Sequence, residues 1–423
     1  MSRAVTAPST AIGERQRPLI VDVAAPLYVV LYLLVAFLPF EGLVNMPGSV
    51  PSFVLPGIGL CVLALTPTTR LSRLPINLSL VAFVVWSALS VLWSRDPGST
   101  IFAIRSELFP LIVVALVAGT VPPRVLARAV LQGSLVLCAW SLLTSIALSS
   151  SRSTILSDTL ETQFGFRGTF GHKNDLGVFA VLTLAAALPM LRVRGRRVIL
   201  ALLVLTAMAT RSATAGSGLL ALAFLYAWML AIGRGRSQRD RRLLLTISVT
   251  AAIVALLSAL RLMPIVLALY DKDVTFSGRT IIWAASFDVA AQRPFTGWGL
   301  GGVFTEVPTS LTMELWQHIG FEAAHTHNGA MEVLIELGLI GLVLLIAVIV
   351  GIFRVANRVG RYDDARPQAR WAVLFMTSLI VMAIAEPLLT GPYLGYMAIV
   401  WAVVANLENE HRHPDRRARL STW

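Results

Sequence analysis

The sequence predicts an all-α polytopic membrane protein with about twelve transmembrane helices and a large extracytoplasmic loop that carries interfacial helices. Of its 423 residues, 56% are hydrophobic and only 14% are charged, and the mean hydropathy is +0.74. Soluble domains carry roughly a quarter charged residues. Long apolar runs are joined by polar connections, and connections rich in arginine alternate with connections that are poor in it. We therefore treat residues 1–423 as a single integral membrane domain.

Each predicted span is a run of about 20 mainly apolar residues, the length that crosses the hydrocarbon core as an α-helix. The second and fourth runs are short or interrupted by proline and glycine, so the count of about twelve holds to within one or two. In chain order the expected spans are about 24–40, 51–66, 76–94, 107–120, 125–149, 174–191, 196–210, 215–232, 243–263, 328–353, 369–386 and 391–408.

Arginine supplies almost all of the net charge of +12, since Lys173 and Lys272 are the only lysines. Cytoplasmic loops of membrane proteins are enriched in positive charge, so we expect the arginine-rich connections and both termini to be cytoplasmic. Such arginines face anionic lipid, and we predict membrane lipids as partners and no nucleic acid. The arginines of this set are Arg70, Arg73, Arg124, Arg128, Arg192, Arg194, Arg196, Arg197, Arg234, Arg236, Arg239, Arg241, Arg242, Arg354, Arg358, Arg361 and Arg366.

The same topology places two long polar intervals, 150–173 and 264–327, on the extracytoplasmic side. ATP and nucleotide sugars are not expected there, so any reaction must use a substrate that is already activated within the membrane. In the larger interval, residues 279–292 have the spacing of a helix that lies in the membrane interface. Its aromatic residues Trp283 and Phe287 are expected at the level of the lipid headgroups.

The strongest candidate for a reactive group is His327, in the stretch Ala324-His325-Thr326-His327-Asn328, where a polar loop meets an apolar run. A neutral imidazole accepts a proton near physiological pH. Asn328 suits the N-cap of the next helix or the orientation of a ligand. The alternative is that both histidines only solvate the end of a span. The residues alone give these two interpretations equal weight, and His325 ranks below His327.

Three arginines on the arginine-poor side suggest an anion site. Arg211 follows a span, Arg279 opens the expected interfacial helix, and Arg167 lies in a glycine-rich loop. The guanidinium group binds phosphate oxygens through a planar fork and stays charged. For any one of them, contact with lipid headgroups is the competing interpretation.

A second polar cluster, His172, Lys173 and Asn174, also stands where a loop enters a span. These side chains suit contact with a ligand. The alternative is that Asn174 or Asp175 caps the helix.

Glu332 and Glu336 follow Asn328 on one helical face, suited either to polarise a histidine or to pair with an arginine. No carboxylate cluster has the spacing of metal ligands, so we predict no metal and no cofactor. The run Gly297-x-Gly299-x-Gly301 lacks the strand and helix of a nucleotide fingerprint, and we interpret it as a glycine-rich turn. Cys61 and Cys138 lie in apolar runs and are expected to be packing residues.

Together these motifs resemble the O-antigen ligase and polymerase superfamily, and in particular its exopolysaccharide-polymerase branch. The most specific match is His327-Asn328, nine residues, then Gly338-Leu339-Ile340-Gly341. The other matches are Gly168 to Asn174, Gly278-Arg279 with Trp283, Pro294, Gly297 and Gly299, and Arg211 with Ser212. The specific resemblance covers about 165–345.

The resemblance implies a glycosyltransferase of the bacterial cytoplasmic membrane with an extracytoplasmic active site. It would transfer a glycan from a polyprenyl-pyrophosphate carrier to a hydroxyl of a glycan or lipid acceptor, with inversion and without metal. By this resemblance His327 would be the general base, and Arg211 and Arg279 would bind the donor pyrophosphate.

Two alternatives stay open at this point. A ligase attaches a finished glycan to a lipid or protein acceptor, whereas a polymerase extends a growing chain, and the Lys173-Asn174 pair favours the polymerase. A lipid-linked glycan flippase would place ionisable groups in mid-span. Here they gather at one face, which favours an enzyme.

Overall fold

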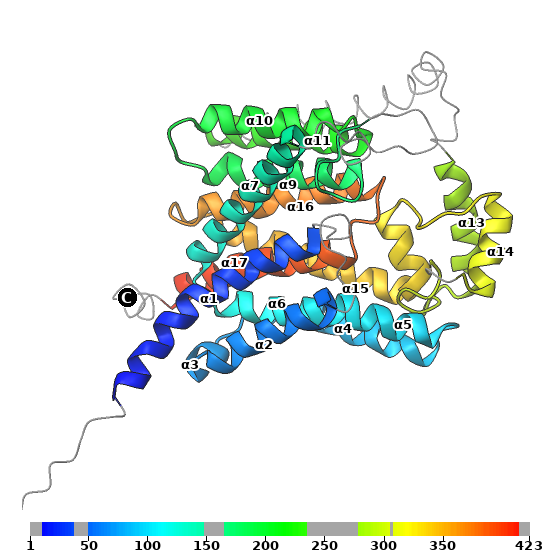
Figure 1. Ribbon diagram of the computed structural model, residues 1–423, viewed down its shortest axis with the longest axis horizontal. Coiled ribbons are helices and arrows are strands. Elements are labelled where there is room, and N and C mark those ends of the chain that lie inside the picture. The colour runs from blue at the N-terminus through cyan, green and yellow to red at the C-terminus, as the bar shows by residue number, and fades with distance from the viewer. Residues whose placement is uncertain (1–10, 38–49, 148–164, 235–277, 305–307, 414–423) are drawn as a thin grey trace, which may run out of the picture.

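The computed structural model describes residues 11–37, 50–147, 165–234, 278–304 and 308–413, where helices joined by loops make up the fold and no strand occurs (Figure 1). The predicted all-α class is therefore confirmed. The α-helices are α1 (Ala11–Phe37), α2 (Leu55–Leu65), α3 (Thr68–Leu71), α4 (Leu78–Leu89), α5 (Pro97–Ala103), α6 (Phe109–Thr120), α7 (Pro123–Ala147), α9 (Lys173–Met190), α10 (Arg196–Ala209), α11 (Ala213–Arg234), α13 (Arg279–Gln292), α14 (Ser310–Ile319), α15 (Gly329–Val359), α16 (Arg366–Ala383) and α17 (Gly391–Arg412). The shorter helical segments are η2 (Val50–Val54), η3 (Ser90–Leu92) and η4 (Ile104–Leu108).

Five helical segments of the described chain are long and apolar enough to cross a membrane, and three shorter ones are apolar. The count of twelve spans stays a prediction, and the expected span 243–263 lies outside the described residues. The five are Pro97–Thr120, Pro123–Thr144, Lys173–Met190, Ala213–Ala231 and Gly329–Val359, and the three are Val21–Phe37, Ser52–Leu65 and Leu78–Leu92.

Helices α9, α16 and α17 lie in the middle of the bundle, between α10 and α11 on one side and α2, α4 and α6 on the other (Figure 1). Every residue of α9 from 176 to 187 is buried, as expected for a helix that is surrounded by others. Helices α13 and α14 run across one end of this bundle and enclose a small separate core (Figure 1).

Helix α13 has the bounds expected for the helix in the large loop, 279–292. One face of this helix, with Ile282, Ser286 and Val289, is buried. Trp283 donates its indole N–H to the carbonyl of Thr326 (2.9 Å), and its expected place at the level of the lipid headgroups stays a prediction. The helix therefore supports the His325–Asn328 turn directly.

Helix α15 is broken at Gly338, whose φ of 67° and ψ of −172° are not helical. Such a break leaves backbone groups without helical partners, which is costly at membrane depth unless other parts of the protein supply them. The segment 294–299 and one indole supply them here. The bonds join the Leu339 amide to the Pro294 carbonyl (2.7 Å), the Trp298 amide to the Ile335 carbonyl (3.0 Å), the Gly299 amide to the Glu336 carbonyl (2.8 Å) and the Trp86 indole to the Leu337 carbonyl (2.9 Å).

Glycine is required on both sides of this junction. A Cβ atom on Gly338 would overlap the carbonyl group of Phe295, and one on Gly297 would overlap the carbonyl group of Glu336. Both glycines also have positive φ, which other residues adopt only at a cost. The interpretation of Gly297-x-Gly299 as a turn is confirmed, and Gly338 of the most specific motif has a structural role.

The variant Gly338→Ala is expected to destabilise the protein by about 3 kcal/mol, because the left-handed backbone costs about 1–2 kcal/mol and the overlap with Phe295 adds about as much. The matched control Gly351→Ala lies in the same helix, where the new Cβ meets nothing nearer than Trp401 at 3.7 Å. Thermal unfolding in detergent measures both. Equal midpoints for the two variants would contradict the role assigned to the break.

Candidate active site

The His325–Asn328 turn is fixed by the buried residues Thr326 and Glu332. The amide and hydroxyl of Thr326 both donate to Oε2 of Glu332, at 2.8 and 2.6 Å. Asn328 is the N-cap of α15, as predicted, because its Oδ1 accepts the amides of the next turn. Its Nδ2 donates to the carbonyl of Ile384 (3.1 Å). Glu332 thus shapes the turn, a role outside the two that the sequence suggested.

His327 has a φ of +52°, and Arg211 has a φ of +51°; they are the two non-glycine residues with positive φ among those described. Backbone strain of this kind persists where the surrounding structure imposes it, often at functional sites. At His327 it lets the amide donate to Nδ1 of His325 (3.2 Å) and brings the two rings to 4.0 Å between centroids. Burial lowers the pKa of His325 to about 4, and the neighbouring His327 adds to the shift.

Glu386, in the turn between α16 and α17, joins residues from three other segments. Its Oε1 accepts hydrogen bonds from Arg279 (3.0 Å) and from Nδ2 of Asn174 (2.6 Å), and Arg279 also donates to the carbonyl of Ala385. Its Oε2 lies 3.5 Å from Nδ1 of His327. Burial opposes ionisation of Glu386, but the contact with His327 and the charge of Arg279 outweigh it and hold the pKa of this carboxyl below its usual range.

Sequence reasoning missed Glu386 because it ends an apparently ordinary apolar run, the expected span 369–386. A signal was present, since Glu386 is the single acidic residue between Asp364 and Glu408. An ionisable residue within an apolar run is a candidate functional residue by default.

The second predicted cluster lies beside this carboxylate. His172 is the N-cap of α9, because its Nδ1 accepts the amide of Asn174 (3.2 Å). The alternative in which Asn174 or Asp175 caps the helix is therefore wrong, and the Asn174 side chain binds Glu386 instead. Burial lowers the pKa of His172, although the charge of Glu386 opposes the shift.

Lys173 and Arg167 complete this side of the site. Lys173 is buried, and Arg167 donates to the carbonyl of Gly171 (3.2 Å). The positive charges of both act on His172. The site therefore holds the cations Arg167, Lys173 and Arg279 near the carboxylate of Glu386, an environment suited to an anionic ligand.

Arg211 occupies the connection between α10 and α11, with an exposed side chain. Its segment packs on the loop that precedes α9: the amide of Phe166 donates to the carbonyl of Ala209 (3.1 Å), and Thr210 lies against Gly165. The structure thus places Arg211 next to the loop that carries Arg167, whereas Arg279 and His327 meet directly at Glu386.

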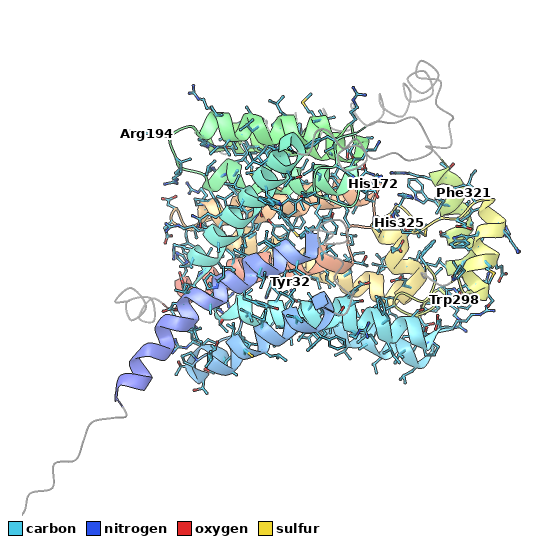
Figure 2. The ribbon with its side chains drawn as sticks, viewed as in Figure 1. Tyr32, His172, Arg194, Trp298, Phe321 and His325 are labelled. Atoms are coloured by element: carbon cyan, nitrogen blue, oxygen red, sulfur yellow. The ribbon has the colours of Figure 1, made fainter. Side chains whose placement is uncertain are left out.

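These residues gather at one end of the bundle. Figure 2 shows His172 and His325 close to the end that α13 and α14 cover, with Arg194 at the opposite end. The candidate site and the arginine-rich connection 192–197 therefore lie at opposite ends of the bundle. The side of the membrane that each end faces stays a prediction.

The arrangement suits proton transfer beside a bound anion. Nδ1 of His327 is buried and faces Glu386, whereas the imidazole as a whole is 32% exposed. The exposed part of the ring is therefore the edge away from the carboxylate, where an acceptor hydroxyl would approach. One nitrogen of His325, one of His327 and one oxygen of Glu386 also lie within 4.8 Å of one another, close enough for a shared metal ion.

Comparison with known proteins points in the same direction. Residues 198–346 match the O-antigen ligase family, a range that includes Arg211, Arg279 and His327. The chain is also 25% identical to the exopolysaccharide production protein ExoQ of Rhizobium meliloti (strain 1021), over 74% of each chain. Together with the apolar helices, these matches indicate an integral bacterial membrane protein of polysaccharide biosynthesis. The resemblance to the O-antigen ligase family and its exopolysaccharide branch, which the motifs predicted, is therefore confirmed.

Proposed function

We propose that this protein transfers a glycan from a polyprenyl-pyrophosphate carrier to an acceptor hydroxyl at the outer face of the cytoplasmic membrane. The observation that carries the proposal is the shared carboxylate of Glu386, which holds a histidine and an arginine on its two oxygens. A base and a fixed cation side by side are what this transfer needs, because one substrate loses a proton while the other gains negative charge.

In the proposed reaction His327 accepts the proton of the acceptor hydroxyl through its exposed Nε2. The acceptor oxygen then bonds to the anomeric carbon, and the bond from that carbon to the pyrophosphate oxygen breaks on the opposite face, with inversion. Polyprenyl pyrophosphate leaves with the electron pair, and Arg279 and Arg211 stabilise its charge. Glu386, whose Oε2 lies 3.5 Å from Nδ1 of His327, stabilises the imidazolium that forms through its negative charge.

We favour polymerisation, because the Lys173-Asn174 pair resembles the exopolysaccharide branch, and the similarity to an exopolysaccharide production protein supports this choice. The matched family is itself described as O-antigen ligase. A ligase that attaches finished glycan to a lipid or protein acceptor would use the same donor chemistry. A flippase is the second class, and it needs neither a base nor an exposed imidazole.

Purified protein supplied with a lipid-pyrophosphate-linked repeat unit tests the proposal. A polymerase yields longer lipid-linked chains with no nucleotide added, and a ligase yields product only with its separate acceptor. Unchanged repeat units under all conditions would contradict glycan transfer.

In the same assay, Arg279→Gln is expected to lower kcat/KM for the donor about 100-fold, because one charge-assisted contact to the leaving group is lost. Arg194→Gln, at the other end of the bundle, is the matched control and should transfer normally. An unchanged dependence on donor concentration in Arg279→Gln would count against a phosphate-binding role.

A further inference from the structure

His327 and Glu386 are spaced for a metal ion better than for a hydrogen bond. Nδ1 of His327 and Oε2 of Glu386 are 3.5 Å apart, longer than the usual N–H···O separation of about 2.7–3.2 Å. Nδ1 is buried and makes no hydrogen bond. Two ligands that each lie about 2.0–2.1 Å from a tetrahedral Zn²⁺ are about 3.4 Å apart, close to the observed distance.

His325 provides a third ligand. One ring nitrogen of each histidine and one carboxylate oxygen lie within 4.8 Å of one another. Two histidines and one glutamate form a ligand set that zinc uses in proteins, with a fourth position left for water. Rotation of the half-buried His325 ring would close the remaining gap.

Arg279 does not occupy the oxygen that a metal would need. Arg279 and Asn174 both bind Oε1 of Glu386, whereas Oε2 faces His327. A carboxylate can bind a cation through each oxygen, although the charge of Arg279 weakens the affinity for a second one.

We propose that His325, His327 and Glu386 form an inhibitory site for a divalent transition-metal ion such as Zn²⁺. A neutral imidazole that binds a metal through Nδ1 carries its proton on Nε2. Metal-bound His327 therefore cannot accept a proton from the acceptor hydroxyl. The inhibition, unlike the binding, rests on the proposed role of His327 as the base.

Binding is tested with Co²⁺, whose visible absorption reports four-coordinate geometry, on protein purified without a polyhistidine tag. We expect one Co²⁺ per chain, displaced by Zn²⁺. His325→Gln and Glu386→Gln should each raise the Kd about 100-fold or more, since even the loss of an outer contact costs 10–100-fold. His318→Gln, which removes an exposed histidine of α14, is the matched control and should leave the Kd unchanged.

A further variant tests the position of the ion. Arg279→Gln removes the nearby positive charge and should tighten Co²⁺ binding, whereas an ion held elsewhere would be indifferent to it. An absence of binding, or a Kd that His325→Gln leaves unchanged, would overturn the site.

In the transfer assay Zn²⁺ should abolish activity in a saturable way, and EDTA should restore it. Binding at these residues without inhibition would overturn the inhibitory role, and loss of activity with EDTA alone would show a required metal and overturn it too. A failure of the proposed function can be told apart from a failure of the metal site. It would appear as normal transfer by His327→Ala, whatever the Co²⁺ titration shows.

Discussion

Replacing His327 with alanine is expected to lower kcat for glycan transfer about 10³-fold, because a positioned general base contributes about 10²–10⁴-fold. Some transfer should survive, since Arg279 and Arg211 would still stabilise the leaving group. Donor KM should change little, because the imidazole acts on the acceptor. Lipid-linked products measured over time with purified protein give both constants.

The control for this change is His318→Ala, which removes an exposed histidine from α14 and should transfer at the wild-type rate. Nearly normal kcat in His327→Ala would reject the assignment of the base. It would also favour the interpretation in which the two histidines only solvate the end of α15.

The second large effect is expected for Glu386→Gln, which should lower kcat about 100-fold. Glutamine keeps the size of the side chain but removes the charge that stabilises the imidazolium, and the corresponding change in a serine protease triad is severe. It also removes the ion pair with Arg279, so donor KM should rise. Glu314→Gln, an exposed acid of α14, is the matched control.

A double variant tests whether Glu386 acts on the reaction through the imidazole of His327 or independently of it. If Glu386 acts through His327, adding Glu386→Gln to His327→Ala should lower kcat by less than it does alone, because groups that act as a unit are not additive. Full additivity of the two losses would show that Glu386 acts independently of the imidazole.

The single variant Glu386→Gln should also change how the stability of the fold depends on pH. The pKa of Glu386 is lowered in the folded protein, so its ionised form stabilises the fold fully above the ordinary carboxyl pKa of about 4.3. That contribution is lost as the pH falls through the lowered folded pKa. The difference in thermal midpoint between the wild type and Glu386→Gln should therefore shrink on acidification.

Much of the site could be predicted because its residues lie in short local patterns. His327 and Asn174 each stand where a polar loop meets an apolar run, and Arg279 opens the expected interfacial helix, so local sequence is enough to single them out. Glu386 could not be found in this way. Its importance comes from three long-range contacts, and nothing in the neighbouring residues specifies which side chains the turn after α16 will meet.

The glycines Gly297, Gly299 and Gly338 also show that local sequence does not predict long-range contacts. Local sequence indicated a turn at Gly297 and Gly299, and that prediction is confirmed. This turn packs on the break in α15 at Gly338. The break depends on the approach of two distant segments, 294–299 and 335–340, whose backbone groups form hydrogen bonds with each other. Periodicity predicted an unbroken helix there, because a single glycine barely alters an apolar pattern of this length.

Helix α13 is held by contacts at both ends, so the number of residues in it cannot change without breaking one of them. Its first residue, Arg279, binds Glu386, and the segment just after its end is tied through Pro294 and Phe295 to the break in α15. Each residue of an α-helix adds about 1.5 Å and 100° of rotation. One inserted residue would therefore turn the guanidinium away from its carboxylate, even though the exposed face that includes Phe287 can change freely. Among relatives, we expect the exposed face of this helix to diverge in sequence while its number of residues stays constant.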